Sequence, residues 1–136
     1  MKFYIASSFK NIGKVKYVNE RLKAGGFIHT YDWTQNERAV TIEQLRDIGT
    51  KEKEAVMEAD VIAVLLPAGK GSHIELGIAL GQGKRIYLYS ESDDINNPET
   101  TSTFYHLPQV EKYSGTLDEF IDFLIEGVKD DQSSYI

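Results

Sequence analysis

The chain has 136 residues, enough for one domain that buries a hydrophobic core without metals or disulfides. Its 15 basic and 21 acidic residues give a formal net charge of −6, and no basic cluster interrupts this balance, which argues against a nucleic acid polymer as partner. Cysteine is absent, which excludes disulfides, thiolate metal sites and cysteine nucleophiles. The sequence shows no membrane span and no secretory signal, so a cytoplasmic location is expected.

The first part of the chain predicts two strands around a helix. Lys2 to Ser7 (KFYIAS) has the pattern of a buried strand. Apolar residues recur at helical spacing through residues 11–24, and Gly25-Gly26 ends the pattern. A short second strand is predicted at 27–31, and a polar loop at 32–39.

The middle of the chain begins with a charged helix at 41–59, which Gly49 is expected to bend or break. Asp60 to Leu66 (DVIAVLL) is the clearest strand, since consecutive apolar residues are typical of a parallel strand covered on both faces. A glycine-containing loop and a short helix at 73–82 follow.

The remaining residues predict a strand at 84–89, a long polar connection, an edge strand at 109–113 and a helix at 116–128. We expect one domain over residues 1–129 and a short tail over 130–136.

This alternation of strands and helices, without repeats, predicts the fold class. We expect a single-domain, flavodoxin-like α/β protein: an open parallel sheet of about five strands in order 2-1-3-4-5, with helices on both faces. Ligands bind such sheets beyond the carboxyl ends of the strands, near the point where the strand order reverses. That rule places residues 6–10 and 67–75 together at one site.

The glycine-containing loop is the first candidate for chemistry. Gly69 and Gly71 let the backbone turn tightly, and the following helix start offers unpaired N–H groups to an anion or a sugar. Ser72 and His73 belong to the same candidate binding segment. The spacing matches neither a P-loop nor a dinucleotide-binding glycine motif.

Glu75 has two interpretations. In the first turn of a helix, the dipole would favour its ionised form, as a nucleophile requires. However, Ser72-x-x-Glu75 is also a capping-box pattern, which recurs at Thr41/Gln44 and Thr116/Glu119. Spacing favours the capping interpretation.

The turn after the first strand carries Ser7, Ser8, Phe9 and Lys10, which we predict to contact the substrate. Its hydroxyls can bind a phosphate or a sugar, and Lys10 adds positive charge; serine is equally common in loops without function.

Asp32 and Trp33 follow the second strand. Such a Trp can stack on a nucleobase and an Asp can bind a ring nitrogen or the sugar, although most Trp side chains cover the core. The three histidines show no metal-binding spacing, so no metal site and no cofactor are expected.

Two segments resemble the nucleoside 2-deoxyribosyltransferase superfamily, which includes deoxynucleoside 5′-monophosphate N-glycosidases. The first is Ala59 to Val64 (ADVIAV), and the second is residues 71–84, which contain E-L-G-x-A-x-x-x-G-K from Glu75 to Lys84. Tyr4 to Phe9 (YIASSF) is similar to the first-strand motif of the superfamily. The order of strands and helices agrees over nearly the whole chain.

The resemblance implies that Glu75 is the catalytic nucleophile and that Tyr4 orients it. Glu75 would displace the base of a nucleoside or nucleotide and form a glycosyl-enzyme, which a second base or water then resolves. The loop from Gly69 to Ser72 would meet the sugar or its 5′ substituent.

The sequence departs from this resemblance just before the glycines, where many transferases carry an acid and this chain has Pro67-Ala68-Gly69-Lys70. Lys70 suits a 5′-phosphate, and Asp32 could supply the missing acid. The resemblance also implies a homodimer or larger homo-oligomer, in which Tyr135 and Ile136 of the tail could complete the pocket of a neighbour.

Three functions remain open from the sequence. The first is cleavage or transfer of the N-glycosidic bond of a (deoxy)nucleoside or its 5′-monophosphate. The second is a nucleotide-binding module without turnover. The third is a glycohydrolase of NAD or ADP-ribose-type nucleotides. Enzyme and binder differ in whether Glu75 is free in a cleft or locked in a capping box.

Overall fold

The computed structural model describes residues 1–133, which fold into alternating strands and helices. The strands are β1 (Lys2–Ser7), β2 (Ile28–His29), β3 (Val61–Leu65), β4 (Arg85–Ser90) and β5 (Val110–Ser114). The α-helices are α1 (Ile12–Ala24), α2 (Ile42–Glu58), α3 (Lys70–Gly81) and α4 (Leu117–Ser133). Short 3-10 helices lie at Phe9–Asn11, Trp33–Gln35, Asp93–Asn96 and Thr103–His106.

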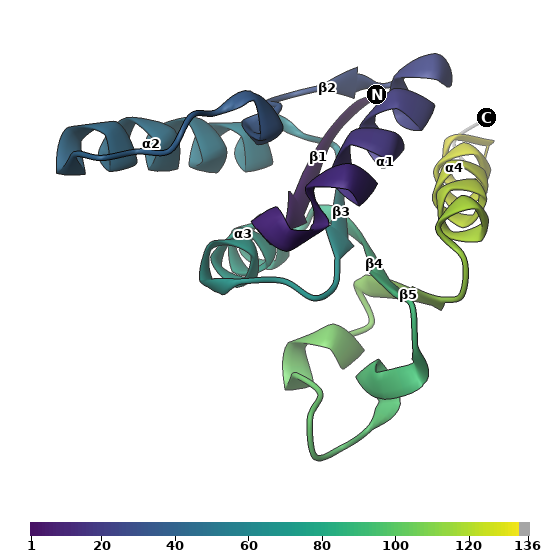
Figure 1. Cartoon of the computed structure of the whole chain (residues 1–136). Helices are drawn as coiled ribbons and strands as arrows, with labels where there is room; N and C mark the ends of the chain where they lie inside the picture. Colours follow the sequence, from purple (N-terminus) through teal and green to yellow (C-terminus); the bar gives the residue numbers. More distant parts are fainter. Residues whose placement is uncertain (134–136) are drawn as a thin grey trace.

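The five strands form one parallel sheet in the order β2-β1-β3-β4-β5, which confirms the predicted fold class. Helices α1 and α4 pack against each other on one face, and α2 and α3 on the other (Figure 1). Ser7 lies opposite Leu65, and Leu65 lies opposite Tyr89, so β1, β3 and β4 end at the same edge of the sheet. The order reverses between β1 and β3, where a ligand site is expected.

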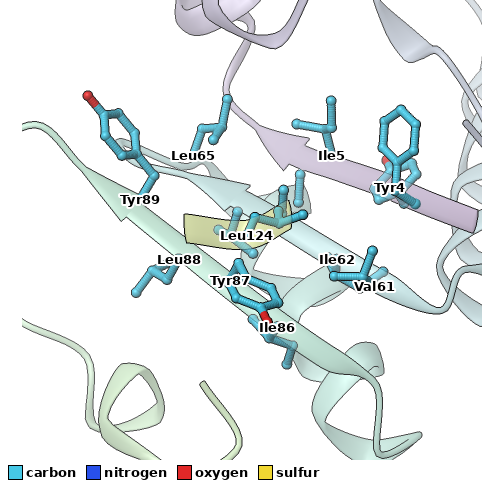
Figure 2. Close-up of a cluster of buried hydrophobic side chains, with 14 of the residues drawn as sticks. Tyr4, Ile5, Val61, Ile62, Leu65, Ile86, Tyr87, Leu88, Tyr89 and Leu124 are labelled. Carbon is cyan, nitrogen blue, oxygen red and sulfur yellow. The ribbon is translucent and has the colours of Figure 1, made fainter. Parts of the chain in front are cut away.

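The core consists of side chains from the central strands and the helices that cover them. Every residue of β3 is buried, as its apolar run predicts. Figure 2 shows residues of β1, β3 and β4 clustered with Leu124 of α4. Burial on both faces fixes these strands firmly, so the loops at their carboxyl ends stand on a rigid base. Within residues 1–133, no helix has the length and apolar character needed to cross a membrane.

The structure differs from the predicted helices at two boundaries and at one predicted break. Helix α3 begins at Lys70 because Gly69, in extended backbone, is its N-cap. Helix α2 continues through Gly49, which lies on an exposed face where helical backbone is tolerated. Helix α4 extends through Ser133, so residues 130–133 are helical rather than tail. Tyr135 and Ile136 lie outside the described residues.

Candidate active site

A cavity of about 740 Å³ opens at the predicted edge of the sheet. This volume is typical of sites for small organic ligands. Its lining comes from the turn after β1, the loop before α2, one face of α2 and the first turns of α3. The lining residues are Ser7, Ser8, Phe9, Lys10, Trp33, Asn36, Glu37, Arg38, Ala39, Leu45, Ile48, Glu52, Gly69, Lys70, Gly71, Ser72 and Glu75.

Glu75 lies on the wall of this cavity and is held by two side chains from other elements. The hydroxyl of Tyr4, on β1, donates to Glu75 Oε2 at 2.6 Å. The same hydroxyl lies 3.3 Å from Oε2 of Glu52, on α2. The Glu52 and Glu75 carboxyls are also hydrogen-bonded to each other. Only 6% of Glu75 is exposed and Tyr4 is fully buried, whereas Glu52 is partly exposed, so the cluster reaches from the core to the cavity.

The surroundings of Glu75 favour its protonated form. Burial raises the pKa of Glu75 to about 9; the hydrogen bond to Glu52 and the charge of Glu52 add to this, whereas the hydrogen bond from Tyr4 acts in the opposite direction. Burial, followed by the two carboxyls, raises the pKa of Tyr4 far above its ordinary value, so its hydroxyl remains a donor. Two adjacent carboxyls cannot both ionise easily, and Glu75 is the one that keeps its proton.

Two predictions about Glu75 are wrong: that it lies in the first turn of its helix, and that it forms a capping box with Ser72. Because α3 begins at Lys70, Glu75 lies in the second turn, where the helix dipole is weak and burial dominates. The predicted capping box at Ser72 does not form, since the N-cap is Gly69 and makes no side-chain cap. The pattern does cap α2, where Thr41 and Gln44 form the reciprocal bonds. Glu75 is consequently available to the cavity.

The turn after β1 is tied to the loop after β3. The hydroxyl of Ser7 donates to the carbonyl of Leu65 at 2.8 Å. The amide of Asn11 donates to Ser7 Oγ and to the carbonyl of Pro67, both at 3.0 Å. Ser7 lines the cavity, but its proton and one lone pair are already engaged. The hydroxyl of Ser8 accepts from the backbone N–H of Lys10 at 3.2 Å.

Trp33 and Phe9 form an aromatic corner of the cavity. Trp33 is 5% exposed, and its indole Nε1–H donates to the carbonyl of Ile5 at 2.7 Å. The rings of Phe9 and Trp33 meet edge to face with centroids 5.2 Å apart. Phe9 itself is 67% exposed. Trp33 therefore closes the core and also lines the cavity, and its stacking on a nucleobase stays a prediction.

Three predicted site residues do not line the cavity: Tyr4, whose hydroxyl bonds Glu75, and the side chains of Asp32 and His73. The Asp32 carboxylate accepts from the backbone N–H of Thr34 at 3.1 Å and from its hydroxyl. Burial raises the pKa of Asp32, but the hydrogen bonds from Thr34 outweigh it and the pKa is lowered overall. Asp32 is thus ionised at neutral pH and unsuited to donate a proton. His73 contacts Gly69 and Tyr105 instead of facing the cavity.

The structure adds Glu52 and the segment 36–39 to the predicted site. Glu52 falls four residues from Ile48 and four from Val56, both apolar, on the inward side of α2. A carboxyl group in an apolar stripe was the signal that could have identified it. The segment 36–39 carried no such signal, because its position depends on how the loop folds over the cavity.

Three basic side chains line the cavity. Lys10, Lys70 and Arg38 line it, and among residues 1–133 none of these side chains makes an ion pair or hydrogen bond. The lining also contains Glu37, Glu52 and Glu75, so the cavity offers groups of both signs to a ligand.

The protonated state of Glu75 leads to a prediction about stability. Between pH 4.5 and about 9 the unfolded chain releases this proton while the folded protein retains it. The stabilising contribution is therefore complete below pH 4.5 and is lost as the pH rises toward 9. We expect Glu75→Gln to be more stable than the wild type by about 1–3 kcal/mol in urea unfolding near pH 8. Exposed Glu54→Gln is the control; identical pH curves for all three proteins would contradict the assignment.

Comparison with known proteins places the fold among solved structures. A CMP N-glycosidase from Clostridium botulinum, BcmB, superposes with a TM-score of 0.61 and 17% identity, over 91% of this chain and 98% of that chain. A de novo designed protein with a Rossmann 2x3 fold gives a TM-score of 0.54 and 18% identity, over 95% and 89%. No family model and no curated protein matches the chain. The chain therefore shares the open parallel α/β fold of a glycosidase at a distant structural level.

Proposed function

We propose that the chain is an enzyme that cleaves or transfers the N-glycosidic bond of a (deoxy)nucleoside or its 5′-monophosphate, with Glu75 as nucleophile. The observation that carries the proposal is a buried carboxyl on a cavity wall, hydrogen-bonded to Tyr4 and to a second carboxyl. Such a cluster costs stability, and perturbed carboxyls in a cleft are typical of catalytic sites. The fold shared with a CMP N-glycosidase adds support.

The carboxyl pair can divide the two roles that glycoside cleavage requires. In the reactive state, the proton of Glu75 has moved to Glu52, and Glu75 is ionised. An oxygen of Glu75 bonds to the anomeric carbon while the carbon–nitrogen bond breaks; that electron pair leaves with the base, which accepts the proton from Glu52. Tyr4 stabilises the Glu75 carboxylate through its hydrogen bond. Paired carboxyls with opposite protonation are a recurring solution to such chemistry.

The second half of the reaction releases the sugar. Glu52, now ionised, removes a proton from water, and the water oxygen bonds to the anomeric carbon as Glu75 departs. A second nucleobase in the place of water gives transfer instead of hydrolysis. The acceptor that the cavity admits after the first base leaves decides between them.

In the proposed binding mode of the substrate, a 5′-phosphate lies at the start of α3. The helix begins without a side-chain cap, so its first N–H groups can bind an anion, and Lys10 and Lys70 line the same cavity. The base would then lie toward Phe9, Leu45 and Ile48, which offer apolar and aromatic surface.

Base release measured by chromatography tests the proposal. The panel consists of nucleosides and 5′-monophosphates, with and without acceptor bases. We expect wild-type turnover, loss of at least about 10³-fold in Glu75→Ala and Glu75→Gln, and loss of roughly 10²–10³-fold in Glu52→Gln. Glu54→Gln, an exposed change on the same helix, should retain full activity.

Acceptor dependence would separate a transferase from a hydrolase. The enzyme proposal fails if no substrate of the panel is turned over while a nucleotide still stabilises the fold, as expected for a binding module. Turnover that persists in both Glu75 variants would remove the nucleophile assignment.

We also propose that the chain self-associates beside the cavity. Large apolar side chains are exposed on the elements that line it: Phe9, Val40, Ile42, Leu45 and Ile74, each at least 54% exposed. Exposed large apolar side chains gathered on neighbouring elements are typical of protein interfaces. Light scattering after size exclusion should give at least twice the chain mass at micromolar concentration, and Leu45→Glu should reduce it. A monomeric wild type would contradict the proposal.

A further inference from the structure

The connection between β4 and β5 is the longest segment without α-helix or strand, and no residue of it lines the main cavity. It is the green segment between those strands in Figure 1. Its second 3-10 helix, Thr103–His106, carries Tyr105, which is 8% exposed and belongs to the hydrophobic core. Tyr105 is therefore anchored, and its hydroxyl faces the start of α3.

His73 joins Tyr105 to the glycine turn, by which we mean residues 69–71. Its Nε2 lies 2.6 Å from the hydroxyl of Tyr105, and its Nδ1 lies 2.8 Å from the carbonyl of Gly69. A carbonyl only accepts, so Nδ1 carries the proton; in the neutral ring, Nε2 then accepts from Tyr105. The two rings also stack, with centroids 5.9 Å apart. A continuous chain of hydrogen bonds thus runs from the core to Gly69.

Gly69 is the residue of the glycine turn whose backbone is held by this chain of hydrogen bonds. It lines the cavity and is the N-cap of α3, yet it has no side chain to hold it. Its carbonyl accepts from the backbone N–H of His73 at 3.1 Å and from the His73 ring. No atom outside its chain neighbours comes within 4 Å of the position that a Cβ would occupy. The turn is therefore restrained at Gly69 through its carbonyl and not through packing around its Cα.

We propose that Tyr105 and His73 are positioning residues, which hold the glycine turn in the shape that binds the sugar and its 5′ substituent. The inference rests on the proposed function and extends it to two residues outside the cavity. Because the turn contacts the substrate away from the reacting bond, its loosening weakens ground state and transition state alike. The predicted signature is a raised KM with little change in kcat.

Three variants isolate the Tyr105–His73 bond. Tyr105→Phe removes the hydroxyl and keeps the ring. His73→Asn keeps a donor near the position of Nδ1 for Gly69 but no longer reaches Tyr105. Both changes delete the same bond from opposite ends, so the double variant should be no worse than either single variant. Tyr113→Phe is the matched control, since it removes a tyrosine hydroxyl that bonds Glu119 instead.

We expect Tyr105→Phe and His73→Asn each to raise KM about 3–10-fold, the size expected from one hydrogen bond, with kcat within about 2-fold of wild type. Amide hydrogen exchange at positions 73–75, the first N–H groups of α3 that have a helical partner, should accelerate in the ligand-free forms of both variants and not in Tyr113→Phe. The exchange measurement is independent of turnover, so it decides the positioning role even if the proposed function fails. Unchanged exchange and unchanged KM, or additive effects in the double variant, would overturn the inference.

Discussion

The site depends on one electrostatic constraint: the buried carboxyl of Glu75 lies against the Tyr4 hydroxyl and next to a second, partly exposed carboxyl, that of Glu52. Glu75 is 6% exposed and accepts from Tyr4 at 2.6 Å, so its charge has few other groups to stabilise it. Such an arrangement stores free energy that the rest of the fold must offset. Tyr4 is fully buried on β1 and lies opposite Ile62 of the fully buried β3, which supplies the rigidity that keeps the three groups in contact.

The topology explains how residues so distant in sequence meet. Tyr4 lies on β1, Glu75 on α3 after β3, and Glu52 on the helix that leads into β3. Because β1 lies between β2 and β3 in a parallel sheet, α2 and α3 lie side by side above it. The inward side of α2, the crossover helix before β3, therefore faces the start of α3. The first half of α2 extends beyond the sheet, and its exposed apolar residues border the cavity.

Some parts of this arrangement were predictable from the sequence, and others were not. The apolar run of residues 61–65 predicted β3, and strand alternation predicted the sheet order and the edge where Glu75 lies. The start of α3 was missed because Ser72-x-x-Glu75 imitates a capping box, while an extended Gly69 ends the loop earlier. Local spacing could not distinguish these two alternatives.

Side-chain direction was the second limit of the sequence analysis. Asp32 and His73 lie in the predicted segments, yet Asp32 caps its own turn and His73 faces Tyr105. Glu52 stands in a stretch of alternating Lys and Glu, where a glutamate normally faces solvent. Its spacing of four residues from Ile48 and from Val56 is a signal for the inward side of α2, and the packing of α2 against α3 establishes that position. For Asp32 and His73, contacts between side chains determine the direction, and the sequence carries no local pattern for them.

The most direct test of the central claim is a titration of the Glu75 carboxyl carbon by NMR, with the resonance assigned from Glu75→Gln. We expect this carbon to titrate near pH 9 in the wild type, and at lower pH in Glu52→Gln, where a neutral amide replaces the second carboxyl. Titration near the ordinary value of 4.5 in both proteins would contradict the claim that burial and Glu52 keep Glu75 protonated.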